Sequence, residues 1–282
     1  MPSSSSVQHA RQALADRLRE VRLDAGLTAR ALSAGAGWHE AKTSRIEHAR
    51  VAPSDADIGT WCEVCNVADQ VPDLVAASRA VSSMWVTWRR LERPGLRRAQ
   101  ESVIPLWERT RQFRIYSPFL IPGPVQTASY IRALLWATRQ RRPNRVDDIE
   151  DAVRVRLAKQ RVTHEGDHRF TVLLEENVLR HQIGGPDILR GQLHHLLAAM
   201  SLPSVTVGII PFAADRSLLR PVEMFFLFDD AEVSVELVSG GLTVTEPTEV
   251  AMYADAFGKL AAMASYGKNA RGLIGTAIDD LG

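Results

Sequence analysis

Hydrogen-bonding side chains gather between residues 39 and 45 of the chain. Lys42 and Arg45 can donate to guanine or to phosphate, and Glu40 can accept from cytosine. An α-helix with its side chains is about 10–12 Å across, and the major groove of DNA is roughly 12 Å wide. A helical segment with this exposed face therefore fits the groove and can contact base edges.

Further candidate contacts lie on both sides of this segment. Thr28 stands at the start of the preceding predicted helix, where it can bind phosphate together with the free backbone amides. Arg30 and Arg50 are candidates for additional contacts to the DNA backbone. The full candidate set for DNA binding is Thr28, Arg30, His39, Glu40, Lys42, Thr43, Ser44, Arg45 and Arg50.

Five short helices are predicted to hold these side chains in place. The first helix carries apolar residues at spacings of four, three and four, which places them on one face. Gly26 ends this helix, Thr28 can cap the second, and the glycines of residues 34–37 allow a tight turn. Ser54 can cap the fourth helix. The predicted helices cover about residues 8–25, 28–33, 38–47, 54–65 and 69–77.

The order of these helices, the glycine-rich turn and the string Ser44-Arg-Ile-Glu47 resemble the Xre family of Cro-like and repressor-like helix-turn-helix proteins, over roughly residues 10–77. The resemblance implies an all-α, DNA-binding N-terminal domain of about five helices. The chain departs from the family at Ala29, Thr43 and Ala49, where a phosphate-bracing glutamine, an aliphatic core residue and a glycine are common. We therefore expect weaker DNA binding than in typical members. The alternative for this region is a helical bundle used for protein contacts.

Two cysteines, Cys62 and Cys65, have the spacing of a metal or redox pair. A structural zinc site needs four ligands, and the sequence has no second pair of cysteines. Both residues share a helical stripe with Ile58 and Trp61, which favours packing in the core. The sequence therefore predicts no metal site here, and the adjacent histidines at 194 and 195 lack a zinc-binding spacing as well.

The rest of the chain alternates between helical periodicity and short apolar runs. Two of those runs flank an Asp-rich turn and predict a hairpin, and together the elements predict an α+β domain with a mainly antiparallel sheet covered by helices. We expect helices at 127–140, 146–163, 186–201 and 247–266, and strands at 170–174, 205–210, 224–228 and 233–238. The predicted domains are a helix-turn-helix domain at 1–78, an Arg/Trp-rich helical connector at 79–103 and the α+β domain at 104–282.

A second resemblance rests on an ordered set of strings that spans roughly residues 100–280. This segment is similar to the uncharacterised domain that follows the helix-turn-helix in many actinobacterial regulators. That resemblance implies a regulator of development or secondary metabolism, often encoded beside a small partner protein in a toxin-antitoxin-like arrangement. It implies no enzymatic activity, and we expect no cofactor. The strings include Tyr116-Ser-Pro-Phe-Leu-Ile-Pro-Gly-Pro-Val-Gln-Thr127, Arg156-Leu-Ala-Lys-Gln160, Leu174-Glu-Glu-Asn177 and Val205-Thr-Val-Gly-Ile-Ile-Pro211.

Within these strings, polar residues are the candidates for ligand or partner contacts. Glu175 and Glu176 end a predicted strand, and adjacent residues on a strand point to opposite faces, so at most one of them can enter a pocket. A role as ligand or partner contact is favoured over acid-base catalysis for this pair. The candidate set is Gln126, Thr127, Arg156, Gln160, Glu175 and Glu176.

The charge is distributed unevenly along the 282 residues, although the whole chain carries only +1. Residues 81–165 hold seventeen Lys or Arg against eight Asp or Glu, a net charge of +9, whereas residues 166–282 carry −7. The basic segment faces either nucleic acid or the acidic segment. Its arginines between Arg89 and Arg98 suit DNA flanking the operator and a solvated helix equally well.

The sequence thus favours a sequence-specific DNA-binding transcriptional regulator that acts as a homodimer on double-stranded DNA. The C-terminal domain would supply dimerisation, a partner surface or a pocket for a small-molecule effector. The alternative is an antitoxin-like adaptor that binds a small protein encoded by an adjacent gene, with autoregulatory DNA binding. No signal-like or membrane-spanning stretch is present, which predicts a cytoplasmic protein without membrane contact, and no catalytic motif supports an enzyme.

Overall fold

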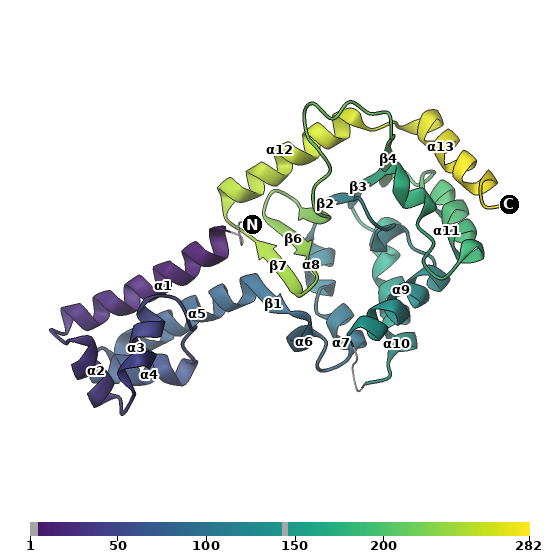
Figure 1. The fold of residues 1–282 in the computed structure, drawn as a ribbon. Coiled ribbons are helices and arrows are strands. Elements are labelled where there is room, and N and C mark those ends of the chain that lie inside the picture. The colour runs from purple at the N-terminus through teal and green to yellow at the C-terminus, as the bar shows by residue number, and fades with distance from the viewer. Residues whose placement is uncertain (1–4, 143–145) are drawn as a thin grey trace. The chain divides into compact units, whose positions relative to one another are not determined.

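A computed structural model describes residues 5–142 and 146–282 (Figure 1). The chain divides into two compact units, Met1–Val86 and Thr87–Gly282. The segment predicted as a separate connector, residues 79–103, is split between these units. The serine-rich start was expected to fray, and its residues 1–4 lie outside the described residues, whereas Ser5 already belongs to the first helix.

The first unit is helical and packs around one apolar cluster. Trp61, Leu18 and Leu32 lie at the centre of this cluster, and the Trp61 ring nitrogen donates to the backbone oxygen of Leu18 at 3.0 Å. Ser54 and Asp57 form a reciprocal capping box at the start of the fourth helix. The elements are α1 (Ser5–Asp24), α2 (Ala29–Gly35), α3 (Glu40–Glu47), α4 (Asp55–Val64), the 3-10 turn η1 (Ala68–Gln70) and α5 (Val71–Met84).

The start of the second unit consists of short elements, and the chain turns between two of them at Pro94 and Gly95. Gly95 has φ of 110°, which favours glycine, and a Cβ atom there would lie 2.4 Å from a carboxylate oxygen of Asp148. That carboxylate accepts hydrogen bonds from the backbone amides of Leu96 and Arg97, so it caps the next helix. The elements are β1 (Trp85–Thr87), which contains the boundary between the units, α6 (Trp88–Leu91), α7 (Leu96–Glu101) and α8 (Ile104–Arg109).

The remaining elements form a mixed sheet with its covering helices. Four predicted strands and their hairpin are present, whereas β1, β2, β7 and the C-terminal helix were not predicted from the sequence. The strands are β2 (Gln112–Ser117), β3 (Arg169–Glu175), β4 (Val205–Ile210), β5 (Phe225–Phe228), β6 (Glu232–Glu236) and β7 (Gly240–Val244). The helices and turns are η2 (Gly123–Val125), α9 (Ala128–Arg141), α10 (Ile149–Lys159), η3 (Gln160–Thr163), η4 (Glu176–Arg180), α11 (Pro186–Ala199), α12 (Pro247–Met263) and α13 (Gly267–Asp279).

The sheet is mixed, so the expectation of a mainly antiparallel sheet was wrong. Within the second unit the strand order is β7-β6-β5-β2-β3-β4, in which β2 pairs with β3 and β3 with β4 in parallel, while β5 pairs antiparallel with β2 and β6, and β6 with β7. Parallel neighbours need a long crossover, and here α9 and α10 connect β2 to β3 while α11 connects β3 to β4. The helix count is also higher than predicted, because the predicted helical connector contains the two short helices α6 and α7, and α8 and α13 are additional.

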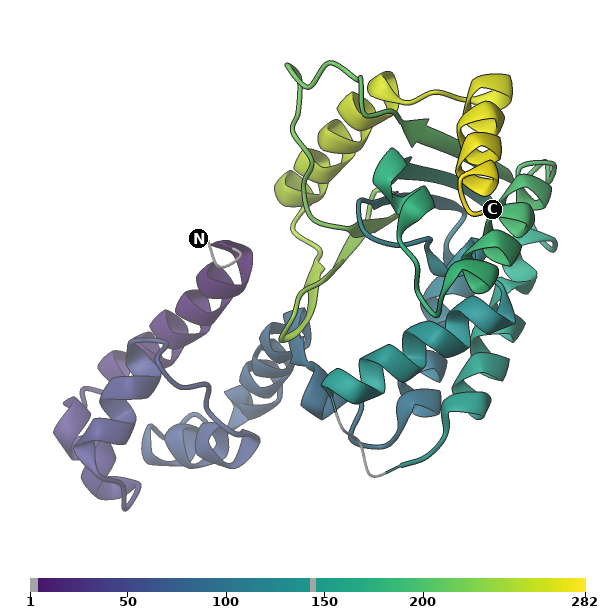
Figure 2. The ribbon, with the colours of Figure 1, turned by 45° about the vertical axis from the view of Figure 1, so that its right-hand side comes forward.

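Helices cover both faces of this sheet (Figure 1). One face, with Phe113 and Phe170 stacked at 4.2 Å between ring centroids, packs against α11 and α13, which lie side by side in Figure 2. The other face presents Phe225, whose ring meets those of Tyr253 and Phe257 from α12. Burial on both faces explains the nearly continuous apolar runs of β3, β4 and β5.

At its outer edge β4 meets the chain between α12 and α13. Ile209 and Ser265 exchange two backbone hydrogen bonds of 2.9 and 2.8 Å. Gly208 permits this approach, because a Cβ atom there would lie 2.7 Å from the Tyr266 ring and 2.9 Å from Leu173. Within the described part of the chain, no helix combines the length and apolar character that crossing a membrane requires.

Candidate nucleic-acid interface

The α2–turn–α3 segment has the local geometry that its residue types predict. Thr28 caps α2 by accepting from the amide of Ala31 at 3.1 Å, and Gly37 turns the chain with φ of 67°. His39 caps α3, because its ring nitrogen Nδ1 accepts from the amide of Ala41 at 3.2 Å. Both helices therefore begin at exposed capping residues, and the two helix starts leave backbone amides available to an anion.

Two buried contacts fix α3 in the unit. The Thr43 and Ser33 hydroxyls lie 2.6 Å apart and join α3 to α2, which satisfies both groups inside the core. At the end of α3, Glu47 pairs with Arg22 of α1 at 2.5 Å, with both side chains buried. Arg22 also donates to the backbone oxygen of Leu27 at 2.6 Å. The orientation of α3 is thus set by polar contacts as well as by Ile46 in the apolar cluster.

Thr43 was placed among the candidate DNA contacts, and the structure corrects that assignment. Its side chain is fully buried, and its hydroxyl is taken by Ser33. A buried side chain on the inner face of α3 cannot reach a base edge or a phosphate.

The other candidates are exposed, except for Lys42, which is half-buried. Arg30 and Glu40 form an exposed ion pair at 3.4 Å that connects α2 to α3. Arg45 is exposed, and its Nε atom donates to the backbone oxygen of Ala41 at 3.0 Å, which leaves its terminal nitrogens free within the described residues. The exposed members of the set are Thr28, Arg30, His39, Glu40, Ser44, Arg45 and Arg50.

Lys42 is held by the unit itself. Its Nζ atom lies 2.6 Å from the carboxylate of Asp57 on α4 and 4.1 Å from the ring centroid of Trp38. Burial acts to raise the pKa of Asp57, but hydrogen bonds from Lys42 and Ser54 outweigh it and hold that pKa below its usual value. Lys42 must therefore leave an ion pair before it can contact DNA.

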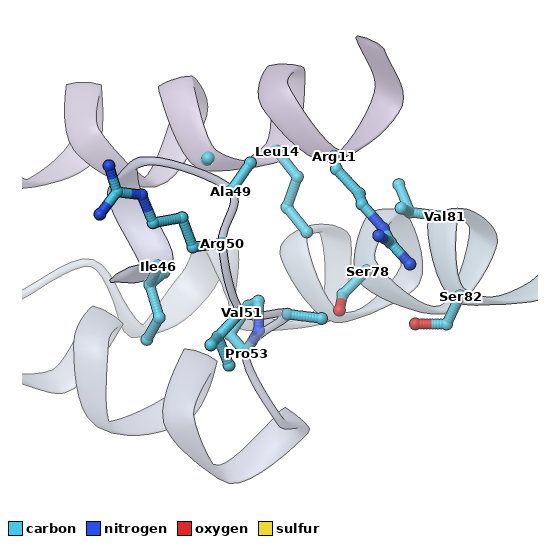
Figure 3. A pocket seen from close by; sticks show the side chains of 12 residues that line it. Arg11, Leu14, Ile46, Ala49, Arg50, Val51, Pro53, Ser78, Val81 and Ser82 are labelled. Carbon is cyan, nitrogen blue, oxygen red and sulfur yellow. The ribbon is translucent and has the colours of Figure 1, made fainter. Parts of the chain in front are cut away.

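A shallow groove of about 220 Å³ lies on the same unit, between α1, the loop after α3 and α5 (Figure 3). Leu14, Val51 and Val81 supply its apolar surface, and Arg11 and Arg50 stand at its sides. The volume is below the roughly 300 Å³ at which small-molecule pockets begin. Ala49 lines the groove with φ of 53°, a conformation that explains why glycine is common at this position in the family that the segment resembles.

In the second unit, the predicted ligand residues around residue 126 hold the loop before α9. The buried Gln126 side chain donates to the backbone oxygen of Ile121 at 2.6 Å, and Gln160 donates to the backbone oxygens of Gly123 and Gln126 at 2.7 and 2.9 Å. Thr127 caps α9. Arg156 reaches the same loop, since its Nη1 atom lies 3.5 Å from the side-chain oxygen of Gln126. The structure therefore brings Gln126, Thr127, Arg156 and Gln160 together.

Glu175 and Glu176 lie apart from that cluster, and each is engaged by the chain. Glu175 is buried, accepts from the Tyr116 hydroxyl at 2.7 Å and pairs with Arg216. Burial raises the pKa of Tyr116 above its usual value, and the hydrogen bond to Glu175 adds to this effect. Glu176 accepts from the amide of Phe212 at 2.9 Å. The two carboxylates thus anchor residues 211–216 to the end of β3.

The cysteine pair lies in the apolar cluster of the first unit, as its stripe predicts. Cys62 is fully buried and Cys65 nearly so, and burial raises the pKa of both thiols. Across residues 5–142 and 146–282, no three His, Cys, Asp or Glu side chains are grouped as metal ligands would be.

Within the second unit, some arginines of the basic segment (residues 81–165) pair with carboxylates of the acidic segment (residues 166–282). Arg109 lies 3.7 Å from Glu232, and Arg114 lies 2.5 Å from Asp230. Other arginines of the basic segment pair within it, such as Arg132 with Glu150 at 2.5 Å. The arginines at 89, 90, 97 and 98 are exposed.

Comparison with protein families gives two matches. The family described as Domain of unknown function (DUF5753) matches residues 100–276, and the family described as Helix-turn-helix domain matches residues 13–77. No curated protein matches the chain. A solved structure, "Structure of TrmBL2, an archaeal chromatin protein, shows a novel mode of DNA binding", is 11% identical with a TM-score of 0.33, and covers 76% of this chain and 69% of that chain. A likeness of that size carries no argument about fold or function.

Proposed function

Because the chain belongs to the family of the domain of unknown function DUF5753 and carries a helix-turn-helix domain before it, we propose that it is a sequence-specific DNA-binding transcriptional regulator of the Xre type. The observation that carries the proposal is the helix α3. Its inner face is fixed by Thr43, Ile46 and Glu47, and its outer face exposes Glu40, Ser44 and Arg45. A rigidly held helix with hydrogen-bonding groups on one exposed face is what readout in the major groove requires.

A dimer follows from the size of the recognition helix. At 1.5 Å per residue the eight residues of α3 extend about 12 Å, which covers about four base pairs at 3.4 Å each. So short a site recurs too often in a genome for useful specificity. Two copies related by a two-fold axis would contact two half-sites, with centres roughly 34 Å or a multiple of that distance apart.

Selection of bound sequences from random duplex DNA by the full chain tests this proposal. We expect enrichment of an inverted repeat whose half-sites are about 10 base pairs apart or a multiple of that spacing. Enrichment of one unrepeated half-site would contradict the dimer, and the absence of any enriched sequence would contradict sequence-specific binding.

The biological role within this proposal comes from the resemblance of the C-terminal strings. We propose that the chain regulates development or secondary metabolism in the cytoplasm, and the resemblance supports the regulatory part of this role. Mapping of bound DNA across the genome identifies the regulated genes, and binding confined to unrelated housekeeping genes would contradict this role.

A second candidate function is an antitoxin-like adaptor for a small protein. The observation in its favour is a pair of exposed aromatic side chains near η4, Phe119 and Phe212, which are 59% and 67% exposed. Backbone groups of both residues bond to this turn region, since Phe119 accepts from His181 and Phe212 donates to Glu176. Co-expression with the product of the adjacent gene, followed by size-exclusion chromatography, tests this function. A complex that disappears in Phe119→Ser with Phe212→Ser would support the adaptor.

A further inference from the structure

Two cations project from the same side of α10, because Arg156 and Lys159 are three residues apart. The Arg156 Nε atom donates to the side chain of Gln100 at 2.9 Å, and its Nη1 atom lies 3.5 Å from that of Gln126. The Lys159 ammonium lies 4.3 Å from the ring centroid of Trp107. These three neighbours are neutral, and neither cation has a carboxylate partner within the described residues.

The electrostatic surroundings of this pair disfavour its charge. Burial lowers the pKa of Lys159 to about 7, and the neighbouring Arg156 adds to that effect. Burial also lowers the pKa of Arg156. The acidic group that acts on both is Glu236, which is exposed at the end of β6 and therefore screened by water. Two half-buried cations and one screened carboxylate leave an excess of positive charge at this position.

Other cations on α9 and α10 are arranged differently. Arg132 pairs with Glu150 and Arg154 with Asp151, although these two arginines are more open to solvent, and the half-buried Arg139 pairs with Asp147. Exposed pairs of this kind add little stability, whereas a buried cation gains most from a partner. The two cations that most need an anion are thus without one in the chain itself.

The donors that remain free define what could fill this position. Within the described residues, the Nη2 atom of Arg156 makes no hydrogen bond. The ammonium group of Lys159 donates none of its three hydrogens there. A planar guanidinium beside a point charge suits an oxygen anion with two or three acceptors. Trp107 and Gln126 are 5% and 1% exposed, so an anion at the half-buried cations would lie beside side chains that are closed to solvent.

We propose that Arg156 and Lys159 form a binding site for the phosphate or carboxylate group of a small molecule. Gln100 and Gln126 position the guanidinium, and Trp107 supports the lysine side chain. The site goes beyond the proposed function and does not depend on DNA binding. If no DNA sequence is selected but the anion binds, the regulator proposal is wrong and the anion site is supported. If a DNA sequence is selected but no anion binds, the anion site is wrong and the regulator proposal is supported.

Thermal unfolding of the full chain, with inorganic phosphate and with acetate as probes, tests the site. We expect one of these anions to raise the melting temperature, since a ligand that binds only the folded state stabilises it. Lys159→Met keeps the length and apolar stem of the side chain but removes the charge, so affinity should fall about tenfold or more. The matched control is Arg154→Gln, which removes an exposed charge from the same helix and should leave the response unchanged.

The same variant separates binding from a structural role. Without added anion, Lys159→Met should melt at a higher temperature than the wild type, because it removes an unpaired enclosed charge. A lower melting temperature would assign Lys159 to folding through its contact with Trp107. Equal responses of the wild type and Lys159→Met, or no response of the wild type to either anion up to about 50 mM, would overturn the proposal.

Calorimetry at pH 8 supplies a second readout. With a pKa of about 7, Lys159 is mostly neutral at that pH, although Arg156 and Glu236 also act on it. A bound anion favours the charged form, so binding should take up close to one proton, seen as a heat that depends on the ionisation enthalpy of the buffer. Binding without proton uptake would place the anion away from Lys159.

Discussion

The two units differ in how their least exposed charges are partnered. In Met1–Val86 the buried charges are paired, as in Arg22 with Glu47, and the unpaired hydrogen-bonding groups lie outside on α3. In Thr87–Gly282 exposed arginines such as Arg132 are paired, whereas the half-buried Arg156 and Lys159 have no carboxylate partner within the described residues. An exposed helix face suits a large, rigid ligand such as duplex DNA, whereas a half-buried pair of cations suits a small ligand. The location of unpaired charge thus indicates the size of the ligand that each unit can take.

The largest expected effect comes from breaking the buried pair of the first unit. Glu47→Gln leaves the Arg22 charge inside the unit without a partner, which should cost about 3–5 kcal/mol of unfolding free energy. Urea unfolding of the full chain should show an earlier transition for this unit alone. Glu40→Gln, at an exposed pair on the same helix, should change little. A decrease of less than about 1 kcal/mol in the unfolding free energy of Glu47→Gln would mean that water reaches Arg22. The first unit would then not depend on pairing of its buried charges.

The next largest effect separates Arg45 from Lys42 on the outer face of α3. Arg45→Ala should weaken operator binding by about 1–3 kcal/mol, the value of a bidentate contact to a base. Lys42→Ala should weaken it less and should also destabilise the unit, because Lys42 pairs with Asp57. Titration at fixed salt measures both affinities, and Arg79→Ala on α5 is a control for general charge. Equal decreases in affinity for the two variants would show that Lys42 leaves Asp57 on binding.

The exposed arginines of α6 and α7 test whether the second unit also contacts DNA. Replacing Arg89, Arg90, Arg97 and Arg98 with glutamine should reduce the slope of log affinity against log salt, by about 0.9 for each phosphate that an arginine no longer neutralises. The measurement is a salt titration with operator DNA. An unchanged slope together with a lower melting temperature would assign these arginines to folding, and DNA binding would then be confined to the first unit.

The smallest effect concerns the backbone after α3. Ala49 has φ of 53°, which costs an L-residue about 1–2 kcal/mol, while glycine has no such cost but loses more chain entropy on folding. Ala49→Gly should therefore stabilise the first unit by roughly 0.5–1 kcal/mol. Differential scanning calorimetry measures the gain. Asn66→Gly is the control, because asparagine tolerates the same conformation and little gain is expected.

The sequence predicts the first unit well because its signals are local. The capping residues Thr28 and Ser54 and the glycine turn each act within a few residues, so the helix order could be found without long-range information. Thr43 was misassigned although a signal existed. It lies three residues before the core residue Ile46, which is the spacing of the inner face of a helix.

The second unit was predicted less completely because its sheet depends on distant pairing. The partners of β2 are β3 and β5, more than 50 residues away, and no local pattern shows that one pairing is parallel. The glycines at 240 and 241 concealed β7. Arg156 was identified through resemblance, but Lys159 was missed, since its enclosure and its lack of a carboxylate partner arise only from tertiary packing.

The backbone exchange between Ile209 and Ser265 bears on how the molecule avoids self-association. β4 is the outermost strand at its end of the sheet, and its sequence Val-Thr-Val-Gly-Ile-Ile has the strong β-propensity and lack of charge that favour pairing between chains. An open strand of this kind is a template for aggregation. By occupying the amide and carbonyl of Ile209, Ser265 interrupts the row of free groups near the end of the strand, so that another chain could not extend the sheet along its full length.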